Sequence, residues 1–160
     1  MQDDVPDDDL LYRSVRIQPD ELEIENGIAC RIHAQAFSDR RRRISVDRAS
    51  RVNFEPNRSR KSPNQAIVFL VAKETRKQAP IEHNVPRPDK HFGEWPPRRY
   101  EVGVTSNPLL DNLAHAEIHL VPYEQDSTTP FNKLKEKLKK LINNKLANGE
   151  SVVSLPKILE

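Results

Sequence analysis

The sequence predicts an α+β protein with a mainly antiparallel sheet, a long Pro-rich crossing and a C-terminal amphipathic helix. Several short segments alternate apolar and polar residues, which is typical of strands that bury one face. A proline-rich stretch separates these segments, and a single clear helical pattern follows near the C-terminus. We therefore expect a sheet of five or six strands in one domain, because 160 residues is an ordinary length for one domain.

The N-terminal part predicts a tail, a strand and a hairpin. Residues 1–9 (MQDDVPDDD) are acidic and are expected to form a flexible tail, which leaves 10–160 as the domain. Residues 10–17 (LLYRSVRI) alternate well enough for a short strand or the entry to one. Asn26-Gly27 is a two-residue turn signal and predicts a hairpin that pairs residues 21–25 with 28–34.

The middle of the chain combines loops with one strong strand. The arginine-rich loop SDRRRR precedes Ser45, which we interpret as the cap of a short helical turn. Residues 66–76 (AIVFLVAKETR) begin with seven apolar residues and predict a strand that is buried on both faces. Residues 80–97 contain five prolines and predict a long irregular crossing.

The C-terminal part predicts two strands, a helix and a short end segment. RYEVGVTS, ending at Ser106, alternates and predicts one strand, and residues 114–121 predict another. The helix begins at Thr128 or Thr129, has Pro130 in its first turn and stops at Asn148-Gly149. SVVSLPKIL then predicts a terminal strand or an adhering tail.

Charges of opposite sign are segregated along the chain, although the net charge is only +2. Residues 1–25 hold nine acids against two arginines, and residues 31–61 hold ten bases against three acids. Such local fields steer charged partners. We expect the basic region to bind a protein partner, with nucleic acid as an alternative. The residues assigned to this surface are Arg13, Arg40, Arg41, Arg42, Arg43, Asp47, Arg48 and Arg51.

Several classes of function lack their usual signatures. The sequence has no GxGxxG, P-loop, GxSxG or HExxH motif. Its single cysteine, Cys30, excludes an intrachain disulfide and CxxC zinc sites, and its apolar neighbours suggest that it is buried. No cofactor and no metal are expected. No apolar run approaches ~18 residues, so we expect no membrane span. The acidic N-terminus is unlike a signal peptide, which favours a cytoplasmic protein.

The stretch NPLLDNLAHAEIHLVP holds the chain's densest group of reactive side chains. In a strand, His115, Glu117 and His119 share one face, and each step of two residues covers ~6.6–6.8 Å. The two imidazoles are then ~13 Å apart, too far to share one metal ion. We interpret His115 as a hydrogen-bonded residue that fixes the preceding turn. The alternative is a small metal- or His/Glu-dependent hydrolase or nuclease in which His115 and Glu117 are catalytic.

The chain carries two resemblances to known families. Arg13 in LYRS, Ser45 in ISVD and Glu117 in HAEI follow an order that resembles NAD-using ADP-ribosyl transferases. This resemblance implies that Arg13 holds the dinucleotide and Glu117 the ribose. The segments LYR, AF, SVDRAS and NPLLDNLAHAEI also resemble a family of small, uncharacterised bacterial proteins over roughly residues 10–121. That family implies a compact bacterial domain that often accompanies larger partner proteins, without an established activity.

The function predicted first is therefore a non-catalytic interaction component of a bacterial multi-protein system, such as a defence module. It would bind a protein partner through its basic surface. This prediction depends on the missing catalytic motifs together with the segregated charge. The amphipathic helix carries six lysines and one glutamate between residues 133 and 145, and we expect it to pack on the sheet with its lysines in water.

Overall fold

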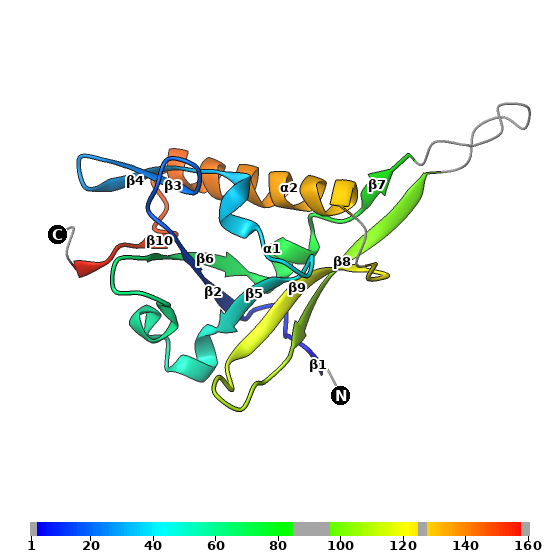
Figure 1. Ribbon diagram of the computed structural model, residues 1–160, viewed down its shortest axis with the longest axis horizontal. Helices are drawn as coiled ribbons and strands as arrows, with labels where there is room; N and C mark the ends of the chain where they lie inside the picture. Colours follow the sequence, from blue (N-terminus) through cyan, green and yellow to red (C-terminus); the bar gives the residue numbers. More distant parts are fainter. Residues whose placement is uncertain (1–2, 85–96, 125–127, 158–160) are drawn as a thin grey trace, which may run out of the picture.

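The computed structural model of the protein describes residues 3–84, 97–124 and 128–157 (Figure 1). Their strands are β1 (Asp3–Asp4), β2 (Leu10–Val15), β3 (Leu22–Glu25), β4 (Ile28–Ile32), β5 (Ile44–Arg48), β6 (Ala66–Val71), β7 (Ile81–His83), β8 (Arg98–Ser106), β9 (His115–Val121) and β10 (Val153–Ser154). The helices are α1 (Ala72–Arg76) and α2 (Thr128–Ala147), with three 3₁₀ turns, η1 (Ala34–Phe37), η2 (Ala49–Val52) and η3 (Pro56–Ser59).

The main sheet confirms the predicted α+β class, but it has more strands than expected. Its path runs β1-β8-β9-β5-β2-β6-β10, β7 pairs with β8, and all of these pairs are antiparallel. The prediction missed β1 and β7, because strands of two or three residues carry too little periodicity to be recognised. It also missed β5, where a helical turn was expected, whereas β10 lies in the segment that was predicted as a terminal strand or an adhering tail.

One face of the sheet is covered by α2, which lies along it in Figure 1. The helix buries one stripe of its surface, as predicted, because its apolar residues recur at three- and four-residue spacing. Its buried residues are Pro130, Phe131, Leu134, Leu138 and Ile142. They join inward-facing strand residues such as Leu11, Ile44 and Ile118 in the larger apolar core.

The opposite face of the sheet carries a smaller apolar cluster and the candidate site. The cluster contains Tyr12, Ala49, Val52, Ile67 and Ala114. Because side chains alternate along a strand, β5 and β9 direct their buried aliphatic residues toward α2 and their polar residues toward this second face.

The N-terminal acidic segment is integrated into the domain and does not form the predicted tail. β1 pairs with β8, and Val5 is only 1% exposed within the main core. Asp7 pairs with Arg76 and Asp9 pairs with Arg48, so basic partners far along the chain neutralise these acids. The composition of residues 1–9 shows none of these partners, and this is why the prediction was wrong.

The predicted hairpin is confirmed as β3 and β4, and its turn has the expected conformation. Asn26 and Gly27 both have positive φ angles, 52° and 73°, which a two-residue hairpin turn requires. Cys30, however, is exposed, contrary to the prediction. The hairpin is a separate two-stranded sheet; Leu22 and Ile32 at its end are buried in the core, and Ala29 packs against it.

Three further predictions need correction. Ser45 lies inside strand β5 and caps no helix, because β5 pairs with strands on both sides. The predicted strand at 66–76 ends at Val71, where the chain turns into α1. The irregular crossing begins with the short strand β7, and most of its remainder, 85–96, lies outside the described residues.

Candidate active site

The candidate site lies where two neighbouring strands of the main sheet separate. β2 pairs with β5 at only two positions, Leu11 with Arg48 and Tyr12 with Asp47. Beyond this point β2 continues along β6, while β5 continues along β9. The polar backbone groups at the separated edges must therefore find other partners.

Arg13 and Asp39 bridge this separation. Arg13 Nη1 donates to the carbonyl oxygen of Ser45 at 2.9 Å and to Asp39 Oδ2 at 2.9 Å. Asp39 Oδ2 in turn accepts the backbone N–H of Ser45 at 2.7 Å. Arg13 also donates to the carbonyl oxygens of Ala36 and Ser38, so each of its three guanidinium nitrogens binds the protein.

Arg13 consequently does not lie on a binding surface. It is 7% exposed and points to the side of the sheet that α2 covers, as Leu11 and Val15 do. The side chain that the sequence assigned to a partner or to a dinucleotide instead fixes the strand that carries Ser45.

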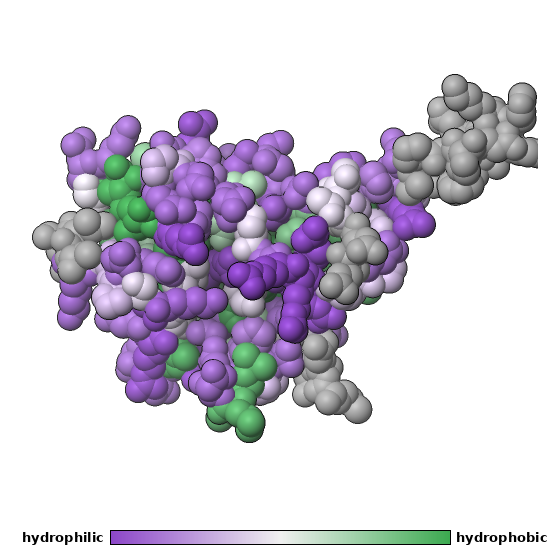
Figure 2. Space-filling model, viewed as in Figure 1, coloured by the Kyte–Doolittle hydropathy of each residue, from purple (hydrophilic) through white to green (hydrophobic). Residues whose placement is uncertain are grey.

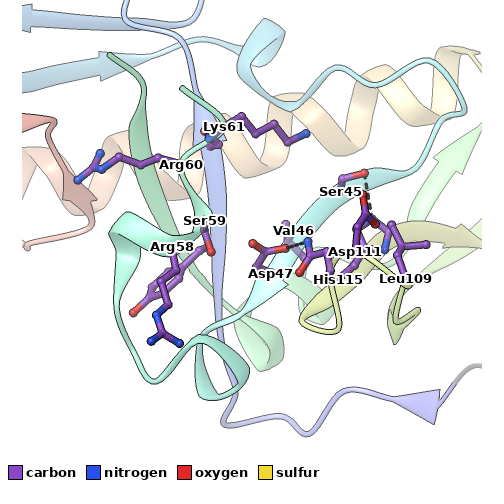
Figure 3. Close-up of a pocket in the computed structure, with 13 residues that line it drawn as sticks. Ser45, Val46, Asp47, Arg58, Ser59, Arg60, Lys61, Leu109, Asp111 and His115 are labelled. Atoms are coloured by element: carbon purple, nitrogen blue, oxygen red, sulfur yellow. Dashed lines mark hydrogen bonds between the residues drawn. The ribbon is translucent and has the colours of Figure 1, made fainter. Parts of the chain in front are cut away.

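A cleft opens on the other face of the sheet, with a volume of about 430 Å³. This volume is within the range typical of small-molecule sites. Figure 3 shows its floor, from which Ser45, Asp47 and His115 project, and its walls, formed by residues 58–61 and by the turn at Leu109 and Asp111. The cleft is lined by Tyr12, Ser14, Ser45, Val46, Asp47, Arg58, Ser59, Arg60, Lys61, Leu109, Asp111, Asn112 and His115.

A second, smaller hollow of about 210 Å³ adjoins the cleft. The two share Ser14 and Lys61 as lining residues, and the hollow also reaches Arg13 and Asp39. The two cavities together therefore follow the separation between β2 and β5. An elongated ligand with polar groups would fit this arrangement.

His115 is oriented by two hydrogen bonds at the floor of the cleft. Its Nδ1 lies 2.9 Å from the carbonyl oxygen of Asn107, and its Nε2 lies 3.3 Å from Ser45 Oγ. A carbonyl oxygen only accepts, so the neutral ring carries its proton on Nδ1 and Nε2 accepts from Ser45. The contact with Asn107 confirms that His115 fixes the NPLLDN turn. The same contact leaves a basic nitrogen facing the cleft.

Glu117 stands beside Ser45 on the neighbouring strand and is 8% exposed. Its Oε1 accepts a hydrogen bond from Asn107 Nδ2 at 2.8 Å and lies 3.4 Å from Arg43 Nη1. Arg43 also stacks on the ring of Tyr123, with 4.0 Å between the guanidinium carbon and the ring centroid. The buried carboxylate is thus held by one amide and one cation.

His119 is separated from this group by its own contacts. Its Nε2 bonds Thr105 Oγ1 at 3.1 Å, and its Nδ1 bonds the carbonyl oxygen of Leu120 at 3.0 Å. A Cβ added at Gly103 would lie 2.7 Å from the ring, so glycine makes room for His119 on the adjacent strand. Within the described ranges, no group of three His, Cys, Asp or Glu residues is arranged to hold a metal.

The other residues of the predicted basic surface have different surroundings. Figure 2 shows hydrophilic side chains over most of the visible face, with apolar ones between them. Asp47 accepts from Asn112 Nδ2 at 2.8 Å and lines the cleft, whereas Arg48 pairs with Asp9 and is mostly buried. Arg51 is exposed and donates to the carbonyl oxygen of Leu113. Of the four consecutive arginines, Arg40 and Arg41 are exposed, and Arg42 and Arg43 are half-buried.

The walls of the cleft were not predicted from the sequence. Arg58 and Lys61 belong to the basic region 31–61, which was expected to bind a partner, but nothing in the sequence placed them at a cleft. Burial raises the pKa of Tyr12 on the floor above its usual value of 10.0 and lowers the pKa of Arg60. The exposed Leu110 and Leu113 near the rim are also unpredicted, although three leucines in a turn sequence are unusual.

Comparison with protein-family models, with curated proteins and with solved structures gave no match. Among the described residues, no helix is both long and apolar enough to cross a membrane.

Proposed function

We propose that the protein is an enzyme that cleaves the N-glycosidic bond of NAD, in the manner of ADP-ribosyl transferases. The observation that carries this proposal is the position of Arg13, Ser45 and Glu117. They lie on three consecutive strands of the sheet, with Arg13 bonded to Ser45 and Ser45 directly opposite Glu117 in the register. Their order in the sequence thus corresponds to one place in the fold, beside a cleft of suitable size.

The roles of these residues differ in part from those that the resemblance implies. Arg13 donates four hydrogen bonds to protein acceptors, so it supports the site by holding Ser45 in place. The negative charge of a dinucleotide pyrophosphate is better matched by Arg58 and Lys61, which line the cleft. Lys61 also lines the adjoining hollow, where a second part of an elongated ligand would lie.

Cleavage of the N-glycosidic bond is promoted by a negative charge next to the ribose. When the bond between the nicotinamide nitrogen and C1′ breaks, its electron pair leaves with nicotinamide and the ribose becomes positively charged. Glu117 does not line the cleft itself, but it lies directly opposite Ser45, which does. A buried carboxylate at this position would stabilise the charge on the ribose, because little water screens it. Water or an acceptor hydroxyl then forms the new bond to C1′, and His115 Nε2 can accept the proton that is released. With water, the products are nicotinamide and ADP-ribose, as in the predicted His/Glu-dependent hydrolase.

The direct test measures nicotinamide release from NAD by the purified protein and by its Glu117→Gln variant. Glutamine keeps the shape of the side chain and removes the charge, so we expect turnover to fall about a hundredfold or more. Glu101→Gln is the matched control, since Glu101 is an exposed glutamate on the adjacent strand β8. If the wild-type protein neither binds nor cleaves NAD, or if both variants behave alike, the proposal is rejected.

A second candidate is the partner-binding function, favoured by the exposure of Arg40 and Arg41 in the arginine-rich loop. The charge of these residues is available to an acidic protein of a multi-protein bacterial system, since the structure describes no carboxylate partner for either side chain. Charge reversal at both positions should abolish capture of a specific acidic partner. Equal capture by the reversed variant would remove this candidate.

A further inference from the structure

The loop of four arginines ends against the first turns of α2, away from the cleft. Arg42 Nη2 donates to Thr128 Oγ1 at 3.0 Å, and Lys135 Nζ contacts Ser38 Oγ at 2.9 Å. Both cations are half-buried, and their partners are neutral hydroxyl groups. In other half-buried pairs of the described chain, such as Arg48 with Asp9 and Lys145 with Glu74, a carboxylate neutralises the cation. The half-buried Arg60 resembles Arg42 and Lys135, since its described partners are also neutral.

Three observations distinguish these two cations among the described residues. Arg42 Nε is buried and has no hydrogen-bond partner. Arg42 also has a positive φ of 57°, a conformation that residues other than glycine seldom adopt. The pKa of Lys135 is lowered by burial and by the neighbouring charge of Arg42, whereas Glu136 only partly opposes these effects.

We propose that Arg42 and Lys135 form a binding site for a phosphate group, which would lie between the two cations. A guanidinium fork and an ammonium group are the usual protein donors to phosphate oxygens. Thr128 and Ser38 add two hydroxyl groups beside the cations. The exposed Arg40 and Arg41 on the same loop extend the positive charge beyond the site.

This site is distinct from the proposed NAD cleft. Lys135 belongs to α2, which packs on the opposite face of the sheet from Ser45 and Glu117. The ligand would be a phosphorylated small molecule or the phosphate backbone of a nucleic acid, and both offer the same phosphate oxygens. Pyrophosphate and a short single-stranded oligonucleotide serve as separate probes for these two sources.

The experiment uses titration calorimetry on a background in which Arg58→Gln and Lys61→Gln remove the cations of the cleft. We expect pyrophosphate to bind this background, and the further changes Arg42→Gln and Lys135→Gln to weaken binding by about tenfold or more, because two charged hydrogen bonds are lost. The matched control combines Arg31→Gln with Lys157→Gln, two exposed positions that remove the same charge elsewhere. Tighter binding of the oligonucleotide that depends on Arg40 and Arg41 would identify nucleic acid as the source.

A second measurement separates a ligand site from a structural pair. Without ligand, Lys135→Gln should leave the melting temperature unchanged or raise it, because it removes repulsion between like charges. Adding pyrophosphate should raise the melting temperature of the background and have little effect on this variant. Equal weakening in the matched control, no binding by the background, or a large loss of stability in Lys135→Gln would each overturn the proposal. Failure of NAD cleavage would leave this result unaffected.

Discussion

Replacing Arg13 by alanine should destabilise the protein and open the separation between β2 and β5. The guanidinium group satisfies the backbone of Ser45 across this separation and neutralises Asp39. It also holds the carbonyl oxygens of Ala36 and Ser38 in and after the η1 turn. Truncation therefore leaves a carboxylate and three carbonyl oxygens without their donor in a poorly hydrated place.

The size of the expected loss in stability follows from the burial of Arg13 and Asp39. The side chains of Arg13 and Asp39 are 8% and 27% exposed, so solvent screens their interaction only weakly. A hydrogen bond to a charged group contributes about 1.5–3 kcal/mol, and the two bonds of 2.9 Å are the strongest here. Breaking a buried charge pair from one side typically costs about 3–5 kcal/mol. We expect the free energy of unfolding to fall by about that amount.

Urea unfolding followed by circular dichroism measures this loss. Arg16→Ala is the matched control, because Arg16 lies three residues away, is 68% exposed and pairs with Glu21 at 3.9 Å. Its removal should change the free energy of unfolding by less than about 1 kcal/mol. If Arg13→Ala were as mild as this control, Arg13 would not be what holds β2 and β5 together across their separation.

Three other variants test the fold around the site. Gly103→Ala should lower stability by about 1–3 kcal/mol, since its Cβ would lie 2.7 Å from the ring of His119, and a thermal melt measures this. Val5→Ser should cost about 1–3 kcal/mol in urea unfolding, because Val5 is buried, whereas a tail residue would show no loss. Burial raises the pKa of Tyr12 in the folded protein. The contribution of Tyr12 to stability is therefore intact below about pH 10 and is lost as the pH rises through the folded-state pKa. Tyr12→Phe should therefore lose less stability than wild type between about pH 9 and pH 11 in urea titrations.

The features of the fold that could be predicted are those with strong local signals. β9 and α2 were expected because their residues keep one period over a complete element, seven and twenty residues respectively. The turn of the β3–β4 hairpin was also local, since Asn26-Gly27 determines it almost alone. β1, by contrast, is a two-residue strand that pairs at an edge of the sheet, and no local signal marks it.

Only part of the candidate site could be predicted from the sequence, for a related reason. His115 and Glu117 drew attention because they occur close together in an otherwise apolar strand. Nothing local places Ser45 3.3 Å from His115, because that contact spans 70 residues and depends on the register between β5 and β9. Arg13 was chosen for its charge and for the two resemblances, and neither signal shows that it is buried and supports the site from within.

The strand separation itself leads to a last prediction, which concerns Asp39. This carboxylate binds both Arg13 and the backbone N–H of Ser45, so the two side chains act as one unit. Asp39→Ala alone should destabilise the protein by leaving the Arg13 charge buried without its anion. When Arg13 is already alanine, the same change should cost about 1–3 kcal/mol less, because the charge it balanced is gone. A double-mutant cycle measured by urea unfolding gives this coupling. In the control cycle Arg13→Ala is combined with Asp111→Ala, a change in the wall of the cleft, and the two losses of stability should be additive. Additivity between Arg13 and Asp39 would mean that other contacts connect β2 and β5 across their separation. The shape of the cleft would then not depend on these two side chains.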